Sequence, residues 1–148
     1  MSLRKIITLE NEILRKVSKP VVKFDEGLWN LLDDMKDTLI KSTGVGLAAP
    51  QIAVLKRIFV IMVNNTYFEA INPKITKVSG TQKGPEGCLS IPGRQHNVVR
   101  PNKVTVEFFD RYGNPMSITA VDFMARAICH ETDHLDGVLY IDHVEKNK

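Results

Sequence analysis

Two histidines near the end of the sequence are spaced as metal ligands are spaced on a helix. His130 and His134 belong to the segment His-Glu-Thr-Asp-His, which has the form H-E-x-x-H. On an α-helix, which turns by about 100° per residue, their side chains lie about 40° apart and one turn above the other. Both imidazoles can therefore reach one metal ion, and Glu131 stands beside the place of a metal-bound water. The pattern is typical of sites that activate water.

Two imidazoles hold a divalent ion poorly, so a third protein ligand is required, and a catalytic site leaves one further position open. Peptidases with this motif take the third ligand from downstream, either as a Glu or as a His that follows a Gly. Few residues follow His134, and the three after Gly137 are Val, Leu and Tyr, so neither pattern is present. The third ligand is therefore expected upstream of the motif.

Cys88 is the best candidate for that ligand. It lies in residues 84–92, Gly-Pro-Glu-Gly-Cys-Leu-Ser-Ile-Pro, which we interpret as a turn-rich stretch. A constrained backbone could present the thiolate there, and a metal would keep it deprotonated. The alternative interpretation is a small buried apolar residue, the commonest fate of a free cysteine.

A loop of small residues, Gly-Val-Gly-Leu-Ala-Ala-Pro-Gln over residues 44–51, lets another segment approach closely. The loop lacks the third glycine and the preceding strand of a dinucleotide site, so phosphate binding is not expected. Gln51 ends the loop, and its amide could donate a hydrogen bond to an oxygen that gains negative charge during a reaction.

The three segments G-V-G-L-A-A-P-Q, E-G-C-L-S and H-E-T-D-H together resemble, in order and spacing, the signature motifs of the bacterial-type peptide deformylases. The resemblance extends from about Ile6 to Asp142 and includes residues 91–93 and Arg100. It implies a metal-dependent hydrolase that removes the N-formyl group from the formyl-methionine of newly synthesised polypeptides and releases formate.

The resemblance also implies the reacting groups. Cys88, His130 and His134 would hold the metal, with water as a further ligand. Glu131 would be the general base that takes the proton of this water, and not a ligand.

The resemblance further implies how the substrate is held. The amide of Gln51 and the backbone N–H of Leu89 would stabilise the oxyanion. Val45, Gly46 and Leu89 would border the pocket for the Met side chain, and Gly46 would pair its backbone with the extended peptide.

One divalent metal ion is the expected cofactor. One thiolate and two imidazoles suit zinc, iron, cobalt or nickel alike. The resemblance favours Fe(II) in the cell, and because iron beside a thiolate is oxygen-sensitive, purified protein is expected to hold Zn, Ni or Co. The expected partners are N-formylmethionyl nascent peptides, and the short segment after the H-E-x-x-H motif leaves a transient association with the ribosome open.

The composition is that of an ordinary globular chain of 148 residues, 43% hydrophobic and 25% charged. The formal charge of +3 comes from scattered residues and gives no support for direct nucleic-acid or membrane binding. The longest apolar run, residues 58–63, is far shorter than the about 20 residues of a membrane span, and the start lacks the apolar stretch of a signal peptide. We therefore expect a cytoplasmic monomer with free thiols at Cys88 and Cys129.

The expected fold is one α+β catalytic domain over residues 1–148, with antiparallel β-sheets packed around a central metal-binding helix and an N-terminal helix. Apolar residues at helical spacing predict the first helix from an N-cap at Asp25 to a stop at Gly44. A second helix is predicted from about Ala120 to Leu135, with Gly137 as its left-handed cap. The predicted strands cover residues 57–63, 67–71, 74–78, 104–109 and 116–120.

Other residues are interpreted as structural. Cys129 lies about 100° from the ligand face and is expected to pack as a small apolar residue. His96 and His143 are read as surface or structural side chains. Glu86 and Arg100 are expected to pair and brace the Cys88 segment, the alternative being two solvated charges.

Two rival functions remain open from the sequence. A general H-E-x-x-H peptidase is disfavoured because the downstream ligand is missing. A non-catalytic metal-binding or peptide-binding module is disfavoured because it would not need Gln51 and Glu131. Neither residue is required to hold a metal, yet both are present. The sequence leaves open the native metal and the substrate preference beyond Met.

Overall fold

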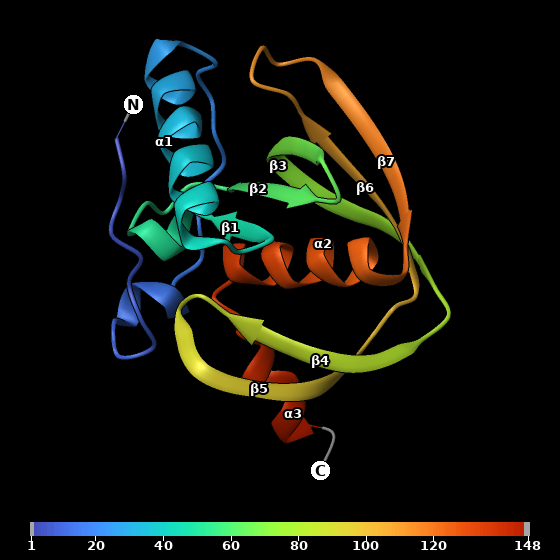
Figure 1. Ribbon diagram of the computed structural model, residues 1–148. Helices are drawn as coiled ribbons and strands as arrows, with labels where there is room; N and C mark the ends of the chain where they lie inside the picture. Colours follow the sequence, from blue (N-terminus) through green and yellow to red (C-terminus); the bar gives the residue numbers. More distant parts are fainter. Residues whose placement is uncertain (1, 147–148) are drawn as a thin grey trace.

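One helix, α2 (Asp122–Leu135), lies between two antiparallel β-sheets (Figure 1). The computed structural model describes residues 2–146. The larger sheet has the strand order β1 (Gly46–Ala48), β2 (Ile58–Val63), β3 (Thr66–Ser79), β6 (Lys103–Phe109) and β7 (Pro115–Val121). The smaller sheet pairs β4 (Gln82–Cys88) with β5 (Ile91–Arg100). The remaining helices are η1 (Glu12–Arg15), α1 (Glu26–Ser42), η2 (Ala49–Ile52) and α3 (Tyr140–Lys146).

The larger sheet is covered on both faces near β2. Successive side chains of a strand point to opposite faces, and β2 follows this rule. Phe59 and Ile61 pack in the cluster that contains Ile128 of α2, whereas Ile58 and Val60 pack with the apolar stripe of α1. Double coverage explains why residues 58–63 read as a continuous apolar run without alternation.

The α+β class, with antiparallel sheets around a central helix and an N-terminal helix, is confirmed. The Asp25 side chain caps α1 by accepting the N–H of Leu28. The helix ends at Ser42, two residues before the predicted stop at Gly44. It ends there because Thr43 already takes the left-handed conformation with φ 59°. Gly137 is left-handed at φ 73° after α2, as expected, and its N–H bonds the His134 carbonyl.

The prediction that Cys88 lies in a turn-rich stretch holds only for Leu89 and Ser90, which form a turn directly after it. Residues 82–88 form β4, and Cys88 is its last residue, opposite Ile91 of β5. The glycines and proline of this segment have low strand propensity, so the local sequence does not announce a strand. Pairing with β5 holds the segment extended despite an irregular register between Glu86 and Cys88.

Other elements also differ from the expectation, among them β5, η1 and η2, which no predicted element covered. Residues 66–79 form one strand, β3, instead of two, since bulges near Asn72 and Ile75 let it bend while it pairs with both β2 and β6. The strand β1 and the helix α3 are too short to show a periodic pattern. Among the described residues no helix has both the length and the apolar character needed to span a membrane.

Candidate metal-dependent active site

Three potential metal ligands from two distant segments converge beside α2. One donor atom each from Cys88, His130 and His134 lies within 4.8 Å of the others. The Cys88 Sγ is 3.4 Å from the His134 Nε2, and the ring centroids of His130 and His134 are 5.0 Å apart. Helix α2 brings the histidines together by the i, i+4 spacing, and the end of β4 brings the sulfur to them.

The imidazole of His130 is held by a buried carboxylate. Its Nδ1 lies 2.9 Å from Glu86 Oε1, which leaves Nε2 free to face the other donors. Arg100 donates two hydrogen bonds to Glu86, at 2.8 and 2.9 Å, and Arg126 donates a third at 2.6 Å. The expected pairing of Glu86 with Arg100 is thus confirmed. A carboxylate on the far nitrogen is the usual way in which a metal-binding histidine is oriented.

The surroundings of the two histidines shift their pKa values in opposite directions. Burial opposes a charge on His130, but the contacts with Cys88 and Glu86 outweigh it and raise the pKa of His130 to about 10. Burial, together with the neighbouring His130, lowers the pKa of His134 well below its usual value. His134 is therefore neutral, the form that binds metals, whereas His130 would release a proton to a cation that binds there.

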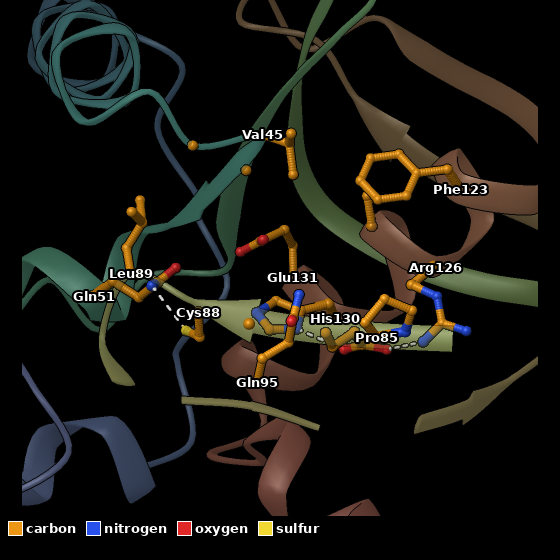
Figure 2. Close-up of a pocket in the computed structure, with 15 residues that line it drawn as sticks. Val45, Gln51, Pro85, Cys88, Leu89, Gln95, Phe123, Arg126, His130 and Glu131 are labelled. Atoms are coloured by element: carbon orange, nitrogen blue, oxygen red, sulfur yellow. Dashed lines mark hydrogen bonds and ion pairs between the residues drawn. The ribbon is translucent and has the colours of Figure 1, made fainter. Parts of the chain in front are cut away.

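The side chain of Glu131 points from α2 toward β1 (Figure 2). Its Oε1 is buried and has no hydrogen-bond partner among the described residues. Burial raises the pKa of this carboxyl to about 7, although the proximity of His130 works in the opposite direction. A carboxyl with such a pKa can both accept and return a proton near neutral pH.

Gln51 reaches the sulfur of Cys88 from the short helix η2 (Figure 2). Its Oε1 accepts the backbone N–H of Ala48 at 2.9 Å, which fixes the orientation of the amide. Its Nε2 then donates toward Ser90 Oγ at 3.1 Å and the Cys88 Sγ at 3.5 Å. The side-chain donor therefore faces the same space as the metal ligands.

A pocket of about 390 Å³ opens over these groups. Val45, Gly46 and Leu89 all line it, together with Gln51, Cys88, His130 and Glu131. Phe123 and Val45 stand near its opening in Figure 2, and both side chains are exposed. Phe123 and Ala127 also contribute to the lining. They lie earlier in α2, on the same side of the helix as the two histidines.

The donor set fits a divalent transition-metal ion. A thiolate and two imidazoles are soft or borderline ligands, and three protein ligands leave a position for water or substrate. The unpartnered oxygen of Glu131 lies beside these donors without joining them. The arrangement can bind a cation, bring a water next to a carboxylate and present hydrogen-bond donors to a developing anion.

Sequence reasoning missed several supporting residues. Arg126 and Ser90 orient Glu86 and Gln51, but neither stands in a recognisable spacing with its partner. Cys129 packs in the core cluster with Ile128, as expected, and burial raises its pKa to about 11. His143 is not a free surface side chain, because it contacts Asp133.

Comparisons with known proteins agree with this geometry. The sequence model of the family described as "Polypeptide deformylase" matches residues 3–148. A peptide deformylase of Caldicellulosiruptor bescii is 54% identical over 97% of this chain and 87% of its own length.

Solved structures give the same result. The crystal structure of a peptide deformylase from Thermotoga maritima superposes with a TM-score of 0.95 at 37% identity, covering 97% of this chain and 98% of that chain. A Synechococcus elongatus peptide deformylase, crystallised in complex with actinonin, has a TM-score of 0.91 at 38% identity, over 93% of this chain and 76% of that chain.

Proposed function

Since this chain belongs to the polypeptide deformylase family, and is thus a metal-dependent hydrolase that removes the N-formyl group from nascent peptides, we propose that the pocket beside Cys88 is where the reaction occurs. The observation that carries this proposal is the convergence of Cys88, His130 and His134, of which Cys88 and His130 line that pocket. Residues 1–148 then act as one catalytic domain.

The metal is proposed to bind Cys88, His130 and His134, with Fe(II) as the ion in the cell and Zn, Ni or Co in purified protein. The proximity of the three donor atoms supports this ligand set, and the hydrogen bond between Glu86 and His130 Nδ1 supports the use of Nε2 as the ligand atom. When bound, the cation supplies Lewis-acid polarisation and favours deprotonation of a neighbouring water.

Glu131 is proposed to move the proton. Its buried Oε1 accepts a proton from the attacking water, whose oxygen forms the new bond to the formyl carbon. When the C–N bond breaks, the Oε1 of Glu131 returns the proton to the leaving amine. The products are formate and a free N-terminal methionine, so atoms and protons balance.

The negative charge on the formyl oxygen is proposed to be met by the amide of Gln51 and the backbone N–H of Leu89. The Gln51 Nε2 is held in place by the Ala48 contact to its own Oε1. As charge develops, this donor exchanges its weak contact with the Cys88 sulfur for the oxygen of the substrate.

The substrate peptide is proposed to lie along β1, with its Met side chain bordered by Val45, Gly46 and Leu89. The strand β1 is the outer strand of the larger sheet, so one edge of its backbone is available to pair with an extended peptide. Actinonin, which the Synechococcus elongatus relative binds, is proposed to occupy the same pocket.

Formate release from formyl-Met-Ala-Ser by the metal-reconstituted protein tests the assignment. We expect release that a chelator abolishes and that actinonin inhibits, with no cleavage of Met-Ala-Ser lacking the formyl group. Hydrolysis of the unformylated peptide would instead indicate a general peptidase. Absence of formate release under metal-loaded conditions would overturn the proposal.

The cellular setting follows from the substrate. We propose that the protein is a cytoplasmic monomer that meets formylated nascent peptides, with a transient association at the ribosome. Sedimentation of the purified chain tests the monomer, and co-sedimentation with ribosomes tests the association.

A further inference from the structure

Helix α3 contacts α2 through a histidine that no catalytic motif contains. His143 Nε2 lies 2.8 Å from Asp133 Oδ2. An ionised carboxylate only accepts hydrogen bonds, so this contact places the imidazole proton on Nε2. Asp133 Oδ2 also accepts a hydrogen bond from Arg100 Nη1 at 2.7 Å, and His143 Nε2 lies 3.2 Å from the same Nη1. Asp133 Oδ2 therefore accepts from both His143 and Arg100, and the three groups form a triangle in which these two donors lie side by side.

The triangle continues to the metal-ligand candidates. The other edge of the Arg100 guanidinium donates to both oxygens of Glu86, and Glu86 Oε1 faces His130 Nδ1. The side chains of Arg100 and Glu86 are each only 4% exposed. Water does not screen this part of the chain of contacts, so a change at one end alters the other.

The guanidinium is a planar fork whose position is set by what holds both of its edges. Glu86 holds one edge, and Asp133 holds the other. Asp133 and His143 are each 27% exposed, which makes the outer end of the chain the part where water can compete. By occupying the Asp133 carboxylate, His143 limits the directions in which that carboxylate can turn away from Arg100.

A second contact links the same helix to the same ligand. The ring of Tyr140, the first residue of α3, stacks against His130 at a centroid distance of 6.1 Å and an interplanar angle of 26°. Tyr140 is fully buried and belongs to the apolar cluster that the partly buried Cys88 contacts. Helix α3 thus lies against His130, and its Tyr140 belongs to the cluster against which Cys88 packs.

We propose that His143 is a positioning residue for the metal site, holding His130 in its ligating orientation through Asp133, Arg100 and Glu86. This inference depends on the proposed function, because it assumes that His130 binds the metal. His143 touches neither metal nor substrate and acts only through the chain of hydrogen bonds.

The test compares two amides at position 143 in the Co(II)-loaded full chain. The Nε2 of a glutamine reaches the place of the imidazole Nε2, whereas asparagine is one methylene shorter. Chelator titration, followed by the thiolate-to-Co(II) absorption, gives the affinity. We expect His143→Gln to keep the Co(II) affinity within about 2-fold and His143→Asn to lower it about 10-fold. A loss of about 10-fold is the lower end of what removal of a residue that orients a metal ligand causes.

Asp142→Asn is the matched control on the same helix. Asp142 pairs with Arg15 and caps the N–H of Leu139, and among the described residues neither hydrogen bond joins the chain that leads to His130. We expect this variant to lower the thermal unfolding temperature while leaving the Co(II) affinity and absorption spectrum unchanged.

Each outcome decides the question. Equal affinities of the His143→Gln and His143→Asn proteins would overturn the positioning role, as would an Asp142→Asn protein that loses as much affinity as His143→Asn. If the unaltered chain shows no thiolate-to-Co(II) absorption, the proposed metal site itself is wrong, which separates that failure from a failure of the present inference.

Discussion

Glu131 and His134 lie one turn apart or less on the same helix, yet their surroundings assign them different tasks. The Glu131 oxygen is unpartnered in the pocket wall, whereas the His134 Nε2 faces the Cys88 sulfur. We expect Glu131→Gln to retain the metal and lose about 10²- to 10⁴-fold in formate release, the usual contribution of a general base. His134→Ala should lose the metal.

Metal content by atomic emission, measured beside formate release, separates these two effects. Equal metal loss in both variants would contradict the assigned roles. The unaltered chain, purified and loaded in the same way, is the reference for both.

Residue types and spacing predicted the two histidines, Glu131 and Gln51 as candidates, whereas for Cys88 they left a small buried apolar residue as the alternative. The surrounding network was not predictable in the same way. Glu86 meets Arg126 across a distance of 40 positions, and only the packing of β4 on α2 brings the two together. A sequence shows that a buried carboxylate needs partners, but it does not show which arginine will supply them.

At the scale of elements, β1 and α2 approach each other closely at the site. A Cβ on Gly46 would lie 2.5 Å from Glu131 Oε2 and 2.9 Å from Glu131 Cδ, which is closer than atoms can pack. We therefore expect Gly46→Ala to displace the Glu131 carboxylate and lower formate release by about 100-fold, as a misplacement of about 1 Å can do.

Gly27→Ala is the control for this substitution. Gly27 lies in α1, where the nearest atom to an added Cβ is 3.4 Å away, an ordinary contact. This variant should keep full activity and gain up to about 1 kcal/mol in stability from helix propensity. Full activity of the Gly46→Ala protein would show that β1 does not constrain Glu131.

The N-terminal segment is attached to α1 by a buried carboxylate. Asp34 accepts the N–H of Ser2 at 2.8 Å and the Arg4 Nε at 2.9 Å. The hydrogen bond from Ser2, helped by Arg4 and opposed by burial, lowers the pKa of Asp34. A pKa that is lower in the folded state adds stability above the unfolded value, and this stability is lost as the pH falls through the folded value.

We therefore expect Asp34→Asn to destabilise the protein by about 1 kcal/mol at pH 7, the scale of one net hydrogen bond. The difference from the unaltered chain should shrink between pH 5 and the acid limit of the fold. Urea unfolding at a series of pH values measures it, and a difference that stays constant with pH would contradict the role of the Asp34 charge.

Elements with a clear period were predictable, and elements without one were not. The stripe of α1 and the alternation of β6, in which Val104, Val106 and Phe108 face inward, are visible in the sequence. The strand β4 has no such pattern, since Gly84, Pro85 and Gly87 interrupt it. Its conformation depends on pairing with β5, which is a tertiary effect.

At the scale of the whole molecule, a bound metal would link the smaller sheet to α2. The Cys88 donor comes from β4, whereas the two histidines come from the helix that fills the core. A ligand at about 1,000 times its Kd stabilises the folded state by about 4 kcal/mol. For a chain of this size we expect metal removal to lower Tm by about 10 °C.

Calorimetry with and without chelator measures this shift. The Cys88→Ala protein should show little dependence on chelator, because one of the three ligands is gone. A chelator effect of equal size in both proteins would place the stabilising metal elsewhere.

The order of elements along the polypeptide has a further consequence for how the enzyme comes into being. Helix α2 follows every strand of both sheets, and of the described elements only α3 comes after it. Until α2 has been translated, the inner residues of the larger sheet, such as Phe59 and Val106, lack the surface that buries them. The same late helix carries two of the three proposed metal ligands, so burial of the hydrophobic interior and assembly of the proposed metal site depend on the same element. A partly folded molecule without α2 in place would therefore lack the proposed metal site.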